Sequence, residues 1–306
     1  MTLTPANQTN LYGLSNNFNI FKDLYNKKNL PYQLLLSGQK GSGKCTLAYH
    51  LINYILSIDE SNPYDYENFK ISEENKSYKL IQNNTHPNFQ LIDIPHEKKR
   101  IDINQIRNLI QNLRKSSFNQ KPRFILIDNI EYLNISSINA LLKILEEPSE
   151  NIFFILINND KKILPTLKSR CLNFRISLSN DDKKKICNHI FDDNILNLFD
   201  ESFLDHYFTP GKIYQLFKFA KEYEINLMKN NLKKFLSKII EGRYYKKDIF
   251  INDILKDLIE LYLIKNFSIC SFDFFSYFIK KFDNIKKFNL DEESLFLEFK
   301  SKLLDG

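Results

Sequence analysis

A glycine-rich segment that ends in a lysine is the first part of the chain whose residue types suggest chemistry. Gly38, Gly41 and Gly43 precede Lys44, and the apolar run 34–36 comes just before them. Glycines let backbone N–H groups turn inward around phosphate oxygens, and a lysine at a helix N-terminus adds positive charge. The spacing therefore predicts a phosphate-binding loop between a buried strand and a following helix.

Position 45 departs from the phosphate-loop pattern G-x-x-x-x-G-K-[ST], in which a hydroxyl helps to hold Mg²⁺. Cys45 offers a soft sulfur, which suits a hard, oxygen-seeking ion poorly. Thr46 carries a hydroxyl, but it follows the required position by one residue, which turns its side chain about 100° away around the helix. The loop is therefore predicted to be either a phosphate cradle retained without Mg²⁺ or a structural remnant.

Asp128 ends an apolar run, the place where nucleotide-hydrolysing sheets carry a carboxylate that positions a metal. The next residue is Asn129, which cannot act as a base at neutral pH, and Glu131 comes too late to replace it. Asn158 and Asn159 end another apolar run and are candidates for contacting a γ-phosphate beside Asp128. The alternative is that Asp128 only caps a strand-to-loop junction and that both asparagines are ordinary loop residues.

Arg170 follows a short segment, 163–168, whose apolar residues are expected to fix it to the edge of the sheet. The backbone that carries its guanidinium group would then be held rigidly by this packing. Spacing alone does not distinguish a functional arginine from one that is simply solvated.

Apolar runs and helical periodicity alternate along the first half of the chain. The expected strands are 34–36, 89–94, 124–128 and 152–157. The expected helices are 11–30, 46–56, 102–116 and a segment that starts near Ser136 as N-cap and ends before Pro148. This alternation predicts an α/β fold with a parallel sheet covered on both faces.

After Leu178 the patterns are helical only, broken at Thr209-Pro210-Gly211. We place boundaries near 178 and 222. They give a phosphate-loop α/β domain at 1–178, a small helical domain at 179–221 and an all-α domain at 222–306. The second boundary is less sharp, because 218–238 also fits one continuous helix.

The composition of the 306 residues excludes several classes of protein. The net charge of +6 fits proximity to nucleic acid but equally fits a mildly basic soluble protein. Four dispersed cysteines (Cys45, Cys171, Cys187 and Cys270) predict neither a zinc site nor a disulfide framework. The N-terminus lacks a leader pattern, and the longest apolar run, 152–157, is too short to span a membrane. We therefore expect a cytoplasmic protein.

Two longer motifs carry a specific resemblance. Residues 139–148 read Asn-Ala-Leu-Leu-Lys-Ile-Leu-Glu-Glu-Pro, and 164–171 read Leu-Pro-Thr-Leu-Lys-Ser-Arg-Cys. Both closely resemble the bacterial DNA polymerase III clamp-loader subunits of the AAA+ class. Shorter matches support this resemblance: 38–48, 85–87, 103–107, 210–212 and, more weakly, 290–291. The resemblance covers residues 11–220 by motif and implies an AAA+ phosphate-loop domain, a helical lid and a C-terminal collar that mediates oligomerisation.

The departures from the motor subunits favour the delta-prime type within this class. Cys45, Asn129 and the lack of a four-cysteine module point away from hydrolysis by the chain itself, and Lys212 replaces a sensor arginine, which loses the bidentate fork. The resemblance implies that Arg170 serves as an arginine finger in trans, at a neighbouring subunit's ATP.

The resemblance also implies ligands and partners. The positions that match the family's nucleotide site, in degenerate form, are Gly38, Gly41, Gly43, Lys44, Thr46, Asp128, Asn158 and Lys212. No cofactor is required and no protein-held metal is implied, although ATP or ADP could be held without efficient hydrolysis. The implied partners are the gamma/tau motor subunits and the delta subunit in a five-subunit ring, with the sliding clamp and primer-template DNA reached through the complex and no membrane.

Two other functional hypotheses remain compatible with the sequence. One is a catalytically active AAA+ ATPase, either a clamp-loader motor subunit or a helicase-loader-like enzyme. The other is a DNA-binding module, although no helix-turn-helix pattern and no aromatic and basic surface stands out.

Overall fold

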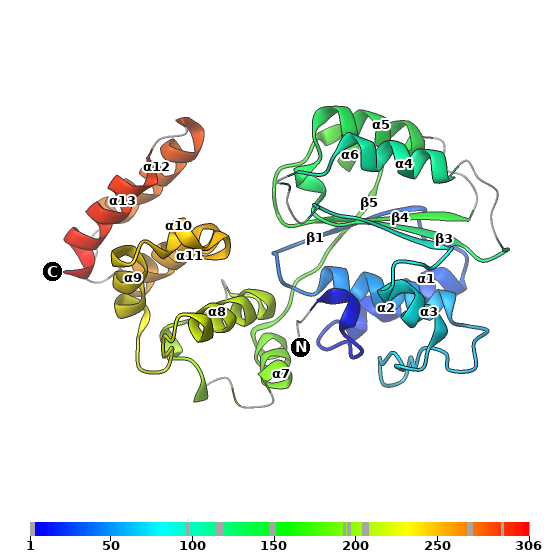
Figure 1. The fold of residues 1–306 in the computed structure, drawn as a ribbon, viewed down its shortest axis with the longest axis horizontal. Coiled ribbons are helices and arrows are strands. Elements are labelled where there is room, and N and C mark those ends of the chain that lie inside the picture. Colours follow the sequence, from blue (N-terminus) through cyan, green and yellow to red (C-terminus); the bar gives the residue numbers. More distant parts are fainter. Residues whose placement is uncertain are drawn as a thin grey trace. The chain divides into compact units, whose positions relative to one another are not determined.

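The computed structural model describes residues 4–95, 98, 100–113, 119–146, 151–191, 194, 197–203, 208–267, 272–288 and 291–305. Pro148, Cys270 and Leu290 lie outside the described residues. The chain forms two compact units, Met1–Lys185 and Ile186–Gly306. Figure 1 shows a sheet with helices in the first unit and helices without a sheet in the described part of the second.

The first unit is built on a five-stranded parallel sheet. In chain order the strands are β1 Gln33–Ser37, β2 Phe89–Ile92, β3 Arg123–Ile127, β4 Ile152–Asn158 and β5 Leu172–Arg175. Across the sheet they follow the order β2-β3-β4-β1-β5. β1 is paired on both sides, with Leu35 opposite Leu156 of β4 and Asn173 of β5. Because all pairs are parallel, the loops after β1, β2, β3 and β4 meet at one edge of the sheet.

Helices cover both faces of this sheet (Figure 1). On one face lie α1 Ser15–Asn26, α2 Lys44–Leu56 and α3 Lys76–Gln82; on the other lie α4 Ile103–Leu113, α5 Ile135–Glu146 and α6 Pro165–Lys168. Alternate residues of β1 serve the two faces, because Leu34 and Leu36 pack in the cluster beneath α1 and α2, whereas Leu35 packs in the cluster beneath α4 and α5. Cover on both faces explains why the central strands are continuous apolar runs.

The four expected strands are confirmed, whereas β5 was not expected. β5 is short and lies at the edge of the sheet, with Leu172 still 53% exposed, so it lacks the buried apolar run that revealed the others. The expected N-cap of α5 was wrong. The helix begins at Ile135, and the side chain of Asn134 accepts a hydrogen bond of 2.7 Å from the backbone N–H of Ser137, which places Ser136 inside the helix.

The described part of the second unit is helical. Its helices are the end of α7 Asn180–Phe191, α8 Pro210–Glu222, α9 Leu232–Glu241, α10 Tyr244–Lys247, α11 Ile249–Lys265, α12 Phe272–Phe288 and α13 Glu292–Phe299. Among the described residues, short helical turns also lie at Pro5–Asn7, Ile130–Tyr132, Glu201–Phe203 and Lys300–Leu304.

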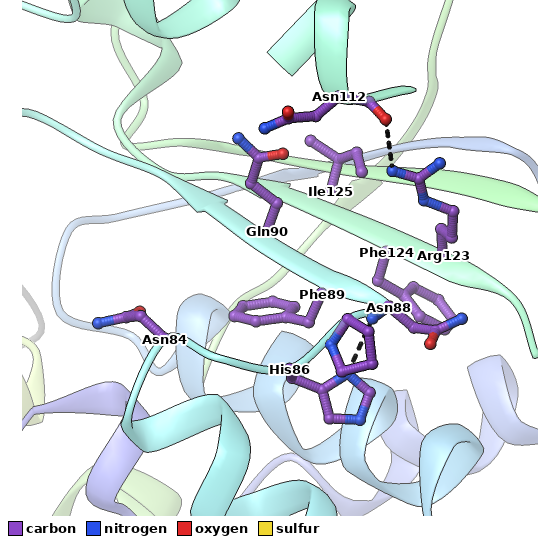
Figure 2. A pocket seen from close by; sticks show the side chains of 10 residues that line it. Asn84, His86, Asn88, Phe89, Gln90, Asn112, Arg123, Phe124 and Ile125 are labelled. Carbon is purple, nitrogen blue, oxygen red and sulfur yellow. Dashed lines mark hydrogen bonds between the residues drawn. The ribbon is translucent and has the colours of Figure 1, made fainter. Parts of the chain in front are cut away.

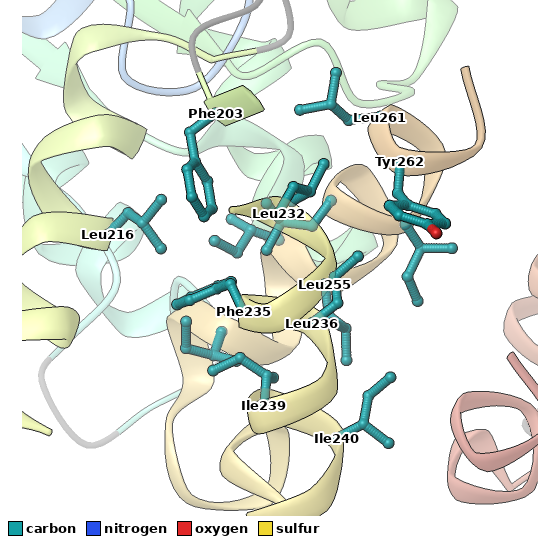
Figure 3. Close-up of a cluster of buried hydrophobic side chains, with 14 of the residues drawn as sticks. Phe203, Leu216, Leu232, Phe235, Leu236, Ile239, Ile240, Leu255, Leu261 and Tyr262 are labelled. Carbon is teal, nitrogen blue, oxygen red and sulfur yellow. The ribbon is translucent and has the colours of Figure 1, made fainter. Parts of the chain in front are cut away.

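One apolar cluster holds these helices together. Figure 3 shows part of it, with Phe203, Leu216 and Phe235 among its buried side chains. Because α8 ends at Glu222 and α9 begins at Leu232, the alternative of one helix over 218–238 is wrong. The division into domains at 179–221 and 222–306 stays a prediction. Among the helices that the structure describes, none combines the length and apolar character that a membrane crossing needs.

Candidate functional site

The glycine-rich loop joins β1 to α2, as predicted. Its backbone has φ values of +147° at Gly38, +83° at Gly41 and +86° at Gly43, a region that L side chains rarely adopt. Gly38 is also confined by the chain that follows β5, because a Cβ atom there would lie 2.2 Å from the carbonyl oxygen of Ile176. The residue that follows the unpredicted edge strand therefore confines the start of the loop.

Lys44 is turned back onto the loop that it closes. Its ammonium group donates hydrogen bonds of 2.8 Å to the carbonyl oxygen of Gly38 and 2.7 Å to that of Gln39. The side chain is buried, and burial lowers the pKa of Lys44 to about 8, against the opposing effect of nearby carboxylates led by Asp128. The hydroxyl of Ser42 is buried as well and has no hydrogen-bond partner among the described residues.

Cys45 and Asp128 lie together beside this lysine. Burial and the nearby Asp128 carboxylate raise the pKa of the Cys45 thiol, which is in hydrogen-bonding contact with that carboxylate. Burial, with the charge of Asp93, raises the pKa of Asp128 to about 6. A thiol in place of a hydroxyl suits Mg²⁺ poorly, and the ammonium group of Lys44 is already engaged by carbonyl oxygens. The residues present therefore do not fit Mg²⁺-nucleotide as they are arranged.

A polar network links the ends of β2, β3 and β4. Asn129, with φ at +57°, donates a hydrogen bond of 2.8 Å from its side chain to the Asp93 carboxylate. The side chain of Asn159 donates to Asn129 at 2.9 Å and to Glu131 at 3.1 Å. Asp93 was not singled out from the sequence. The signal was available, because Asp93 follows β2 as Asp128 follows β3.

Three further residues were predicted to contact a nucleotide, and each has other surroundings. Thr46 lies in the first turn of α2. The side-chain amide of Asn158 accepts from the backbone N–H of Lys161 at 3.2 Å and donates to its carbonyl at 3.0 Å, so it closes the loop after β4. Lys212 belongs to the second unit, where its ammonium group lies 2.5 Å from Asp257. Their roles toward a nucleotide stay predictions.

Arg170 lies in the turn between α6 and β5. Its guanidinium donates a hydrogen bond of 2.8 Å to the carbonyl oxygen of Thr166 and forms an ion pair with Glu146, the last residue of α5. Leu167, one turn earlier, is fully buried in the core between the sheet and α5. The expectation that the apolar residues of 163–168 anchor this segment is confirmed at Leu167 but not at Leu164, which is 38% exposed. The pairing with Glu146 was not anticipated.

A separate pocket of about 450 Å³ lies at the amino-terminal ends of β2 and β3. Figure 2 shows its lining, in which Gln90 and Ile125 lie near Asn112, whose carbonyl accepts a hydrogen bond from Arg123. The candidate site lies at the carboxyl ends of the same strands, so no predicted site residue lines this pocket.

Comparison with known proteins identifies the family. Residues 13–180, more than half of the chain, match the family described as DNA polymerase III, delta subunit. The DNA polymerase III subunit delta' of Buchnera aphidicola subsp. Schizaphis graminum is 31% identical over 178 residues, which are 57% of this chain and 52% of that protein. The subunit delta' of Pseudomonas aeruginosa is 31% identical over 139 residues, 45% of this chain and 40% of that protein. The match thus spans about half the length of these relatives or less.

A solved structure shares the fold across nearly the whole chain. It is a DNA polymerase III, gamma subunit-related protein from Thermotoga maritima, with a TM-score of 0.53 and 14% identity, covering 96% of this chain and 99% of that one. At this identity the likeness concerns the AAA+-like fold alone. The family match, the delta' relatives and the sheet with its phosphate loop agree, and the chain belongs to the DNA polymerase III delta' subunit family.

Proposed function

We propose that this protein is the delta' subunit of a clamp-loader ring, and that it supplies Arg170 in trans to the ATP site of a neighbouring motor subunit. The partners in this proposal are gamma/tau motor subunits and a delta subunit, which together load a sliding clamp on primed DNA. The protein's own contribution to hydrolysis is the arginine, while its own phosphate loop is not a motor.

The contrast between Lys44 and Arg170 carries this proposal. Lys44 is buried and bonded to two carbonyl oxygens of its own loop, whereas the Arg170 side chain is 32% exposed and stands on an anchored turn. A guanidinium group presents a planar fork that matches phosphate oxygens. The accessible cation is therefore suited to a phosphate that another chain holds.

The proposed mechanism is stabilisation of charge on the transferring phosphoryl group. An arginine finger of this kind contributes about 10³ to 10⁵ in rate in GTPase systems. The rigid mount matters because the guanidinium must reach the phosphate without a large ordering cost. In this proposal Cys45 and Asn129 are tolerated because no hydrolysis occurs at the protein's own loop.

The test is a ring reconstituted from the motor subunits, delta and this protein carrying Arg170→Ala. We expect the DNA-stimulated ATPase rate of the ring to fall by the part that the neighbouring subunit's site contributes, because turnover at that site falls by about 10³ or more. Arg175→Ala is the matched control, since Arg175 lies on β5 with its side chain 76% exposed and is expected to leave the rate unchanged. An Arg170→Ala ring with an unchanged rate would contradict the proposal.

The alternative of an autonomous ATPase is tested with the purified chain. Turnover that Lys44→Ala abolishes would support that alternative. We expect no such turnover, because Cys45 and Asn129 lack the chemistry that the reaction needs and Lys44 is bonded to carbonyl oxygens of its own loop.

A further inference from the structure

The guanidinium group of Arg170 already has an anionic partner within its own chain. Glu146 ends α5, and Arg170 follows α6, so the two residues come from different elements that pack on the same face of the sheet. One nitrogen of the guanidinium pairs with the Glu146 carboxylate, and the other donates to the carbonyl oxygen of Thr166 at 2.8 Å. The guanidinium group that is proposed to contact a phosphate is therefore paired with a carboxylate of its own chain.

The backbone beneath Arg170 is fixed independently of this pair. The N–H of Arg170 donates to the carbonyl of Leu167 at 3.3 Å, and the N–H of Ser169 donates to that of Pro165 at 2.9 Å. Leu167 is fully buried, and Cys171 packs against the same core. What Glu146 decides is thus the position of the side chain, not the path of the backbone.

The pair is accessible to water and is therefore easily exchanged. The side chains of Arg170 and Glu146 are 32% and 50% exposed. Pairs of this kind contribute little to stability and are screened by salt. A phosphate offers more negative charge than a carboxylate and accepts the same planar fork, so it competes well for the guanidinium.

We propose that Glu146 is a positioning residue that holds Arg170 until a neighbouring subunit's nucleotide replaces it. This inference rests on the proposed function of Arg170. The Glu146 carboxylate and the γ-phosphate compete for one guanidinium group, so the ion pair within the chain weakens the contact between subunits. Removing the charge of Glu146 favours the transfer of Arg170 to the phosphate.

The test uses a complete ring in which only the motor subunit next to this chain retains a working phosphate loop, so that one site is measured. Glu146→Gln keeps the size of the side chain and one acceptor oxygen but removes its charge. We expect the half-saturating ATP concentration of that site to fall by about two- to fivefold, the range that an exposed ion pair supports. The difference should shrink as salt is raised, because the competing pair is electrostatic.

Two further variants make the outcome specific. Glu74→Gln breaks the pair of Glu74 with Lys79, an exposed ion pair outside the Arg170 segment, and should change nothing. In an Arg170→Ala background, where turnover at this single site is nearly lost and ATP binding is measured instead, Glu146→Gln should have no effect, because its only proposed route is through Arg170.

The possible results separate this inference from the function on which it rests. If Arg170→Ala lowers the rate but Glu146→Gln leaves the half-saturating ATP concentration unchanged or raises it, Glu146 does not compete with the phosphate, and the arginine finger stands. An effect of Glu146→Gln that persists at high salt or in the Arg170→Ala background also overturns the inference. If Arg170→Ala itself has no effect, the proposed function fails.

Discussion

The ammonium group of Lys44 lies 2.8 Å from the carbonyl oxygen of Gly38, the glycine that opens the same loop. Together with the bond to Gln39, this contact satisfies the lysine within its own chain. A phosphate entering the loop would have to break both bonds and recover the cost from new ones. The loop thus keeps the shape of a phosphate site while its principal cation is already engaged.

Restoring the hydroxyl at position 45 should not restore activity. We expect Cys45→Ser to show no ATP turnover as a purified chain, because Asn129 cannot polarise water and Lys44 remains bonded to Gly38 and Gln39. Phosphate release measured with excess Mg²⁺ and ATP checks this, with Cys171→Ser as the control for loss of a thiol. Turnover in the Cys45→Ser variant alone would show that the missing hydroxyl was the main defect.

Asp128 should make the first unit less stable as pH rises. Burial and the charge of Asp93 raise its pKa from 3.8 to about 6, so the folded state binds more protons than the unfolded state between these values. Ionisation of this half-buried carboxyl then costs up to about 3 kcal/mol above pH 6. Asp128→Asn should therefore gain up to about 3 kcal/mol in unfolding free energy over the wild type between pH 4 and pH 7.5.

The measurement is the exchange of the sheet amides in urea, which follows the first unit specifically. Asp102→Asn is the control of opposite sign. The pKa of Asp102 is lowered, chiefly by its hydrogen bond with Lys98, so that variant should lose stability relative to the wild type as pH rises. An Asp128→Asn gain that does not depend on pH would show that its carboxyl group is not the cause.

His50 should make the first unit less stable as pH falls, which is opposite to the effect of Asp128 over an overlapping pH range. Its ring contacts the Tyr64 hydroxyl at 2.9 Å and the Gln8 carbonyl at 3.0 Å, and burial lowers its pKa from 6.5 to about 4. The unfolded chain takes up the proton near 6.5 while the folded one does not until about 4. Stability is therefore lost as pH falls through this window, by about 3 kcal/mol in total.

His50→Asn should lack this contribution, so its unfolding free energy minus that of the wild type should rise by about 3 kcal/mol as pH falls from 6.5 to 4, measured on the same amides. Tyr64→Phe is the control, because it removes one partner of the imidazole but keeps the titrating group and so should retain the slope. A difference between His50→Asn and the wild type that does not change with pH would show that the imidazole is not the cause.

The sequence predicts most of the sheet, because a strand such as 124–127 that is buried on both faces must be apolar throughout. It does not reveal β5, whose position at the edge removes that requirement, although Ile176, the residue after β5, confines Gly38. The cap at Asn134 was missed because Ser136, two residues later, is an equally good candidate by type.

In the candidate site too, the sequence predicts some features and only the folded structure shows the others. Residue types and spacing are enough to locate Lys44 and Cys45, which belong to a phosphate-loop pattern. Arg170 is singled out only by the resemblance of its motif to clamp-loader subunits. The partners of these residues are set by folding: the carbonyls of Gly38 and Gln39 depend on how the loop turns, and Glu146 comes from another helix. Contacts of this kind cannot be derived from spacing along the chain.

The central claim is that this protein's contribution to hydrolysis is Arg170 and not its own phosphate loop. Comparing Arg170→Ala with Lys44→Ala in otherwise identical reconstituted rings tests it most directly, with DNA-stimulated ATP hydrolysis as the measurement. We predict that Arg170→Ala removes the rate of the neighbouring site, whereas Lys44→Ala leaves the rate of the ring unchanged. The reverse pattern, a loss with Lys44→Ala and none with Arg170→Ala, would contradict the account.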